Sequence, residues 1–110
     1  MQRVDIYQGE SHIIEYEVTT PDGLPKDLRL YTAEFRLVLD GTEDLLVSKS
    51  LGDGIEYLNA EVGLLEVTLS PEDTELSPGR YQRELRLWTA GNAHTADAGP
   101  VMIADSLFVA

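Results

Sequence analysis

The sequence predicts an all-β sandwich of about seven to eight mostly antiparallel strands, folded as a single domain over residues 1–110. Apolar and polar residues alternate with a period of two in segment after segment, as they do in half-buried strands. Turn-forming residues separate these segments at intervals of roughly 10 to 15 residues. The helical period of 3.6 residues is not sustained over any long stretch.

Five segments carry the alternation most clearly: 12–18, 33–39, 64–69, 81–88 and 101–109. In the first of them, Ile14, Tyr16 and Val18 are expected to face the core, with glutamates between them facing solvent. Arg83 interrupts the inward face of the fourth segment. We therefore expect its side chain to reach the sheet edge or to pair with a carboxylate.

The turns between these segments have recognisable chemistry. Asp40-Gly41 and Gly91-Asn92 are predicted to be hairpin tips, because glycine and asparagine tolerate positive φ. The stretch 90–99, which contains His94, is predicted to be a loop. In SPEDTELS (70–77), Ser70 is expected to cap one helical turn that begins at Pro71. This proline-bracketed segment is thus predicted to be a corner that leads Tyr81 into the core.

Composition excludes several classes of function. The formal net charge is −12, from 20 acidic and 8 basic residues, which disfavours nucleic acid and anionic membrane surfaces as partners. Without cysteine, the chain has neither disulfides nor thiolate nucleophiles. No apolar stretch resembles a signal peptide or a membrane span, so synthesis in the cytoplasm without membrane insertion is expected.

Chemistry-bearing motifs are absent from the sequence. His12 and His94 lack a nucleophile or an orienting carboxylate at a recognisable spacing, so no catalytic residue and no enzymatic activity are predicted. The acidic groups at 53–56 and 72–75 lack the ligand spacing of a calcium loop, and a structural role is expected for them. No glycine-rich phosphate motif occurs. We therefore predict neither a metal site nor a cofactor.

The order of motifs points to a family. VTTPDGLPKDL (18–28) precedes a strand, and GDGI, GLLEVTLSPEDTELSPGRY and QRELRL follow between positions 52 and 87. This order resembles the immunoglobulin-like domain at the N-terminus of phage baseplate upper proteins and of related small phage and prophage virion proteins. The resemblance implies an immunoglobulin-like β-sandwich that binds neighbouring virion proteins in the tail or baseplate. It also implies a homo-oligomer, a trimer or hexamer, within the particle.

Two alternatives remain open from the sequence. The chain ends where its last strand is expected to end, which makes a capsid decoration protein comparably reasonable. A carbohydrate- or cell-surface-binding module is the other alternative. It is less favoured because aromatic residues make up only 7% of the chain, and most tyrosines occupy positions predicted to face inward.

Candidate partner-binding residues lie at both termini and on one strand. The terminal segments are short, apolar and β-prone, so either could add a strand to a neighbour's sheet. Arginine and tryptophan are enriched at interface hot spots, which favours a contact role for the fourth segment, although a core position for its tryptophan is equally compatible with the sequence. The candidates are Val4, Ile6, Tyr7, Arg86, Trp88, Leu107, Phe108 and Val109.

Overall fold

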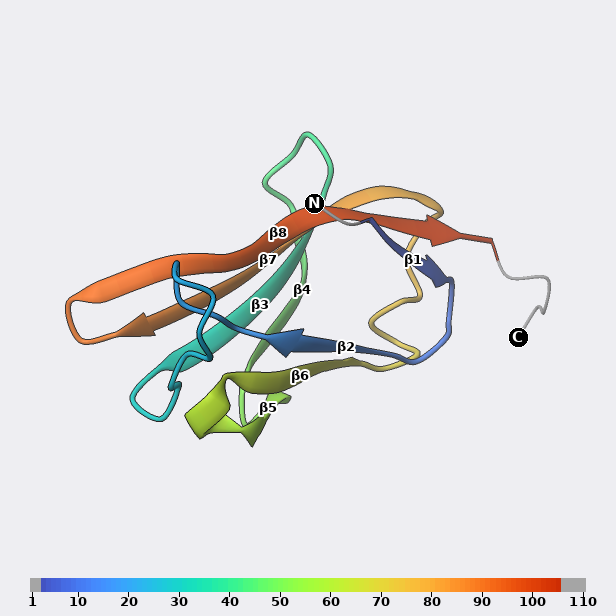
Figure 1. The fold of residues 1–110 in the computed structure, drawn as a ribbon. Coiled ribbons are helices and arrows are strands. Elements are labelled where there is room, and N and C mark those ends of the chain that lie inside the picture. Colours follow the sequence, from blue (N-terminus) through green and yellow to red (C-terminus); the bar gives the residue numbers. More distant parts are fainter. Residues whose placement is uncertain (1–2, 106–110) are drawn as a thin grey trace.

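The described residues form an all-β fold whose eight strands belong to one mixed sheet (Figure 1). A computed structural model describes residues 3–105. The strands are β1 (Val4–Tyr7), β2 (His12–Glu17), β3 (Thr32–Leu39), β4 (Leu45–Leu51), β5 (Gly54–Asn59), β6 (Leu64–Leu69), β7 (Gly79–Thr89) and β8 (Asn92–Ala104). One 3₁₀ turn, η1 (Ala60–Val62), joins β5 to β6. The predicted β-sandwich of mostly antiparallel strands is confirmed.

The sheet order β1-β8-β7-β3-β4-β5-β6-β2 bends into a nearly closed sandwich at the corner between β4 and β5. There the Ser50 amide donates to the Asp53 carbonyl at 3.0 Å, and the Gly52 amide donates to the Ile55 carbonyl at 2.9 Å. Gly52 and Gly54 have φ of 85° and 95°, which disfavours residues with a Cβ. The corner carries the chain from the layer of β8, β7 and β3 to that of β5, β6 and β2 (Figure 1).

The core lies between these two layers, and the predicted inward faces supply it. Phe35 and Leu37 of β3 and Leu85 of β7 are at most 1% exposed, as are Leu65 and Val67 of β6. Burying each such side chain contributes about 1.5–3 kcal/mol of transfer free energy, so the strand alternation largely explains how the layers are held together.

The long strand β8 differs from the prediction. The stretch 90–99 was expected to be a loop, and this was wrong: β8 begins at Asn92, so His94 lies in a strand. This part of β8 is rich in small residues and lacks strong apolar alternation, and it is extended because it pairs with β7 along its length. A register shift opposite Leu85 and Arg86 leaves Ala96 as a β-bulge.

Both predicted hairpin tips are confirmed. The turn from β3 to β4 contains Gly41 with φ of 78°, and the turn from β7 to β8 contains Gly91 with φ of 77°. β4 and β5 were not individually recognised in the sequence. Their alternation is broken by the register shifts at Leu46 and Leu58, which place exposed leucines in both strands.

The corner before β7 has the predicted local structure. The Ser70 hydroxyl accepts a hydrogen bond from the Asp73 amide at 3.2 Å, and the Asp73 carboxylate accepts one from the Ser70 amide at 2.7 Å. This reciprocal arrangement is a capping box. Thr74, 1% exposed, donates its hydroxyl to the Glu10 carbonyl at 2.7 Å. The corner thereby also fixes the turn that joins β1 to β2.

Candidate functional site

Four alternating charges occupy the outward face of β3 and β7. Glu34 and Arg36 point outward from β3, while Glu84 and Arg86 do so from β7. In the antiparallel register Glu34 lies opposite Arg86, and Arg36 lies opposite Glu84. Each strand also has an internal ion pair, Arg36–Glu34 at 2.9 Å and Arg86–Glu84 at 3.5 Å. We call these four residues the charge quartet.

Less polar side chains flank the charge quartet along the same face. Trp88 lies opposite Thr32 at one end, and Gln82 lies opposite Val38 at the other. Trp88 is therefore on the outward face next to Arg86 and not in the core, where its neighbour Leu87 is fully buried. On β8, Ala98 and Pro100 pair with β7 residues of the same face.

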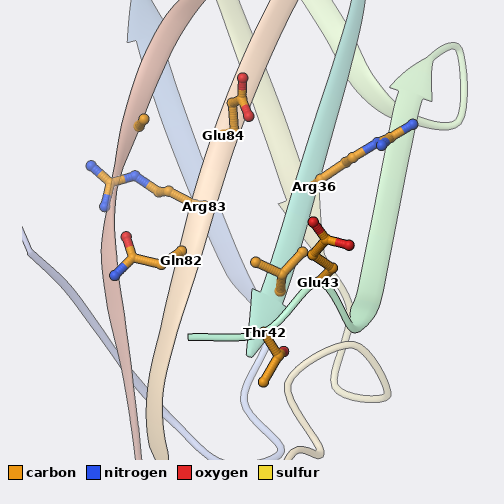
Figure 2. Close-up of a pocket in the computed structure, with 8 residues that line it drawn as sticks. Arg36, Thr42, Glu43, Gln82, Arg83 and Glu84 are labelled. Carbon is orange, nitrogen blue, oxygen red and sulfur yellow. The ribbon is translucent and has the colours of Figure 1, made fainter. Parts of the chain in front are cut away.

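A shallow hollow of about 540 Å³ lies beside the charge quartet (Figure 2). It is open to solvent and is lined by Arg36, Val38, Thr42, Glu43, Gln82, Arg83, Glu84 and Ala98. Figure 2 shows the Arg83 side chain extending toward β8, away from Arg36. The hollow thus spans β3, β7, β8 and the turn between β3 and β4.

Beneath this face, Arg83 is part of a buried polar network. The guanidinium, whose side chain is 4% exposed, donates through Nε to the Asp97 carboxylate at 2.8 Å and through Nη1 to the Pro100 carbonyl at 2.8 Å. The Tyr16 hydroxyl donates to the same carboxylate at 2.8 Å. The prediction that Arg83 pairs with a carboxylate is confirmed. The β-bulge at Ala96 matters here, because it lets His94 and Asp97 both face inward.

The network changes the acidity of Tyr16. Burial of the phenol raises its pKa, and the hydrogen bond to the Asp97 carboxylate together with the negative charge of that group raises it further. Arg83 opposes the effect but does not cancel it. Tyr16 is therefore held in its neutral form, in which it can donate to Asp97.

A second ion pair ties the corner before β7 to the sheet. The Lys49 ammonium lies 2.7 Å from the Asp73 carboxylate, and both side chains are 18% exposed. The aliphatic stem of Lys49 crosses Gly54, where an added Cβ would lie 2.4 Å from Cδ of the lysine. Burial alone would raise the pKa of Asp73, but the hydrogen bonds from Lys49 and Ser70 outweigh it and lower that pKa. Asp73 is thus engaged in a structural contact.

The predicted partner-binding residues occupy two places in the fold. Val4, Ile6 and Tyr7 lie on β1, at one end of the sheet order, where Ile6 is buried and Tyr7 is 55% exposed. Any contact by Ile6 therefore uses its backbone. Arg86 and Trp88 lie together on the outward face of β7. The remaining candidates, Leu107, Phe108 and Val109, lie outside the described residues.

Sequence reasoning missed the other three members of the charge quartet. The signal was present, because AEFRLVL and QRELRLW each place a glutamate and an arginine two residues apart on the outward side of a predicted strand. Recognising the quartet also required knowledge that these two strands are neighbours in register.

The two histidines lie apart in the described part of the fold. The His94 ring meets the edge of Tyr31, with 6.0 Å between centroids, and His12 lies in β2 opposite Leu69. Between residues 3 and 105, no group of three or more acidic or histidine side chains could hold a metal ion. The same range contains no helix long and apolar enough to cross a membrane.

Neither a protein-family model nor a curated protein sequence matches the chain.

Proposed function

We propose that the chain is a non-enzymatic phage or prophage structural protein with an immunoglobulin-like domain, and that it binds neighbouring proteins in the virion. The observation that carries the proposal is the ordered outward face of β3 and β7. There Arg86 and Trp88, residue types enriched at interface hot spots, lie side by side with charges held by ion pairs. The order of turn motifs between Gly52 and Leu87 supports the phage setting.

Strand edges offer a second mode of attachment. β1 and β2 end the sheet order, and each is paired on one side only among the described strands. β8 extends well beyond the four residues that pair with β1, but the bulge at Ala96 and the missing amide of Pro100 interrupt its outer edge. Addition of a neighbour's strand is therefore favoured at β1, which includes Val4 and the exposed Tyr7.

The resemblance favours the tail or baseplate as the place of assembly, and capsid decoration is the second candidate. Both settings require the same kind of molecule, a stable sandwich with ordered contact surfaces. The tail or baseplate and the capsid shell differ in the symmetry of the sites that the chain would occupy. Experiments on the particle, and not on the isolated protein, therefore distinguish them.

Incorporation into particles tests the proposal. The wild-type chain should be detected by mass spectrometry in purified particles at a fixed ratio to the major virion proteins. The Arg86→Ala/Trp88→Ala variant, supplied in place of the wild type, should fold but be depleted at least about tenfold from particles, because it removes hot-spot contacts. Arg29→Ala is the matched control, since its exposed arginine pairs locally with Asp27 and lies outside this face.

Two results would oppose the proposal. Absence of the wild-type chain from purified particles would exclude a virion role, and would turn attention to the carbohydrate- or cell-surface-binding alternative. Normal incorporation of the double variant would remove the outward face of β7 from the assembly contact.

A further inference from the structure

We propose that the outward face of β3 and β7 packs against the same face of a second copy of this chain, across a two-fold axis. This inference names the partner of the face, a second copy of the chain. It rests on the proposed function only in that both assume a protein that acts by assembly. The charge pattern of the face argues for a copy of itself.

The charge quartet is complementary to its own copy. Its glutamates, Glu34 and Glu84, occupy one diagonal, and its arginines, Arg36 and Arg86, occupy the other. A two-fold rotation about an axis lying in the face, either along the strands or across them, exchanges the two diagonals. Every carboxylate of one copy then faces a guanidinium of the other. Such a contact is isologous, because the same patch serves both subunits.

The quartet contributes more to recognition than to folding. Arg36 and Arg86 are each 56% exposed, and ion pairs at such exposure stabilise a fold by only about 0–1 kcal/mol. When two copies meet, the same charges lose water and acquire partners across the interface, where complementary charges fix register and reject mismatched arrangements. The four alternating charges of the quartet can therefore fix how two copies align.

The face is also electrically suited to self-association. The whole chain carries a net charge of −12, so most approaches of one copy to another are repulsive. Along β3 and β7, in contrast, three arginine–carboxylate pairs balance locally: those of the quartet and Arg80–Asp40 at 3.2 Å. Two copies can therefore approach at the charge quartet itself without a net local repulsion.

The dimensions of the face indicate a weak, reversible dimer. Strands are spaced about 4.8 Å apart and rise about 3.3 Å per residue. Together with their neighbours β8 and β4, the strands β3 and β7 therefore present on the order of 500 Å² of flat area along the length of β3. Sheets pack face to face with strands aligned to within about 30°, as either axis allows. This area is below the typical 800 Å² or so per partner of a stable complex. We expect dissociation in the micromolar range.

Sedimentation velocity of two charge-swapped variants, at roughly 10 to 500 μM protein as the expected affinity requires, tests the inference. Arg36→Glu/Arg86→Glu makes the quartet wholly acidic, and Glu34→Arg/Glu84→Arg makes it wholly basic. The wild type should dimerise, whereas each variant alone should dimerise at least about tenfold more weakly through like-charge repulsion. An equimolar mixture of the variants should form a heterodimer at least as strong as the wild-type dimer.

Arg3→Glu/Arg29→Glu is the matched control. It changes the net charge as much as the acidic variant does, at exposed arginines outside this face, and should dimerise nearly as the wild type does. Thermal melting establishes that each variant is folded. If a charge-swapped chain fails to fold, Arg36→Ala/Arg86→Ala replaces it and should also weaken the dimer.

The outcomes separate this inference from the proposed function. A wild type that stays monomeric to 500 μM or so, or a mixture without heterodimer, overturns the self-association of this face. A monomeric protein that is nevertheless incorporated into particles leaves the proposed function standing. If the protein dimerises through this face but is absent from particles, the self-association stands and the proposed function fails.

Discussion

The Arg83 guanidinium lies directly across Gly99, its register partner on β8, while binding Asp97 on the same strand. A Cβ on Gly99 would lie 3.0 Å from Nη1 and 3.2 Å from Cζ of Arg83. The buried arginine and the glycine are thus a matched pair, and neither can be understood from its own position alone.

Gly99→Ala should destabilise the fold by about 1–3 kcal/mol, because the added methyl overpacks a guanidinium that hydrogen bonds to Asp97 and to the Pro100 carbonyl hold in place. Urea denaturation measures the loss in the free energy of unfolding. In an Arg83→Met background the same substitution should be much less destabilising, since the flexible methionine can move aside. An equal loss in both backgrounds would contradict the proposed contact.

Asp97→Ala should destabilise the protein by roughly 3 kcal/mol, because it leaves the Arg83 charge buried without its carboxylate. Tyr16→Phe removes only one neutral donor to that carboxylate and should cost about 1 kcal/mol. An Arg83→Met/Asp97→Leu chain should recover most of the Asp97→Ala loss. Chemical denaturation of the variants would refute the network if Asp97→Ala and Tyr16→Phe were equally mild.

Alkaline stability should depend on Tyr16. Its pKa is raised in the folded state, so its contribution is fully present below the unfolded-state pKa of about 10 and is lost as pH rises through the folded-state value. The free energy of unfolding should therefore fall as pH increases above about 10, and less steeply in Tyr16→Phe. Tyr57, whose pKa is also raised by burial, should leave a residual slope. Identical slopes for wild type and variant would count against a buried neutral Tyr16.

Acid stability should depend on Asp73. The pKa of this carboxyl is lowered in the folded state, so its contribution is present above the unfolded-state pKa of about 3.9 and disappears as pH falls through the folded-state value. Asp73→Asn should lower stability at pH 7 by about 1 kcal/mol and flatten the pH dependence below about 4. Glu72→Gln removes the same charge at an exposed neighbouring position and is the control. Equal effects of the two substitutions would exclude a specific role for the Lys49–Asp73 pair.

How far the sequence predicts this molecule depends on which interactions are local. Period-two alternation correctly gave most of the inward-facing residues of β2, β3, β6 and β7, since it records burial directly; Leu39, also expected to face inward, is 38% exposed at the end of β3. The Ser70–Asp73 capping box and the hairpin glycines were also predictable, because their partners are a few residues away. These predictions succeeded because each depends on residues close together in the sequence.

The rest depended on pairing between distant segments. The first half of β8 is a strand because β7 pairs with it, and the bulge at Ala96 that turns Asp97 inward is a property of that pairing. The charge quartet likewise emerges only when β3 and β7 are placed in register. The periodicity within a single segment does not show which distant strand it pairs with. The wrong prediction of a loop at 90–99 and the failure to recognise the whole charge quartet both follow from this.

Cryo-electron microscopy of the particles to which the proposed function assigns this chain tests the central claim most directly. We expect density for this chain at symmetric positions, with the outward face of β3 and β7 buried against a second copy. Sites on the tail or baseplate would support the setting that the resemblance implies, and sites on the shell would support decoration. A particle whose protein density is fully accounted for without this chain would contradict the account.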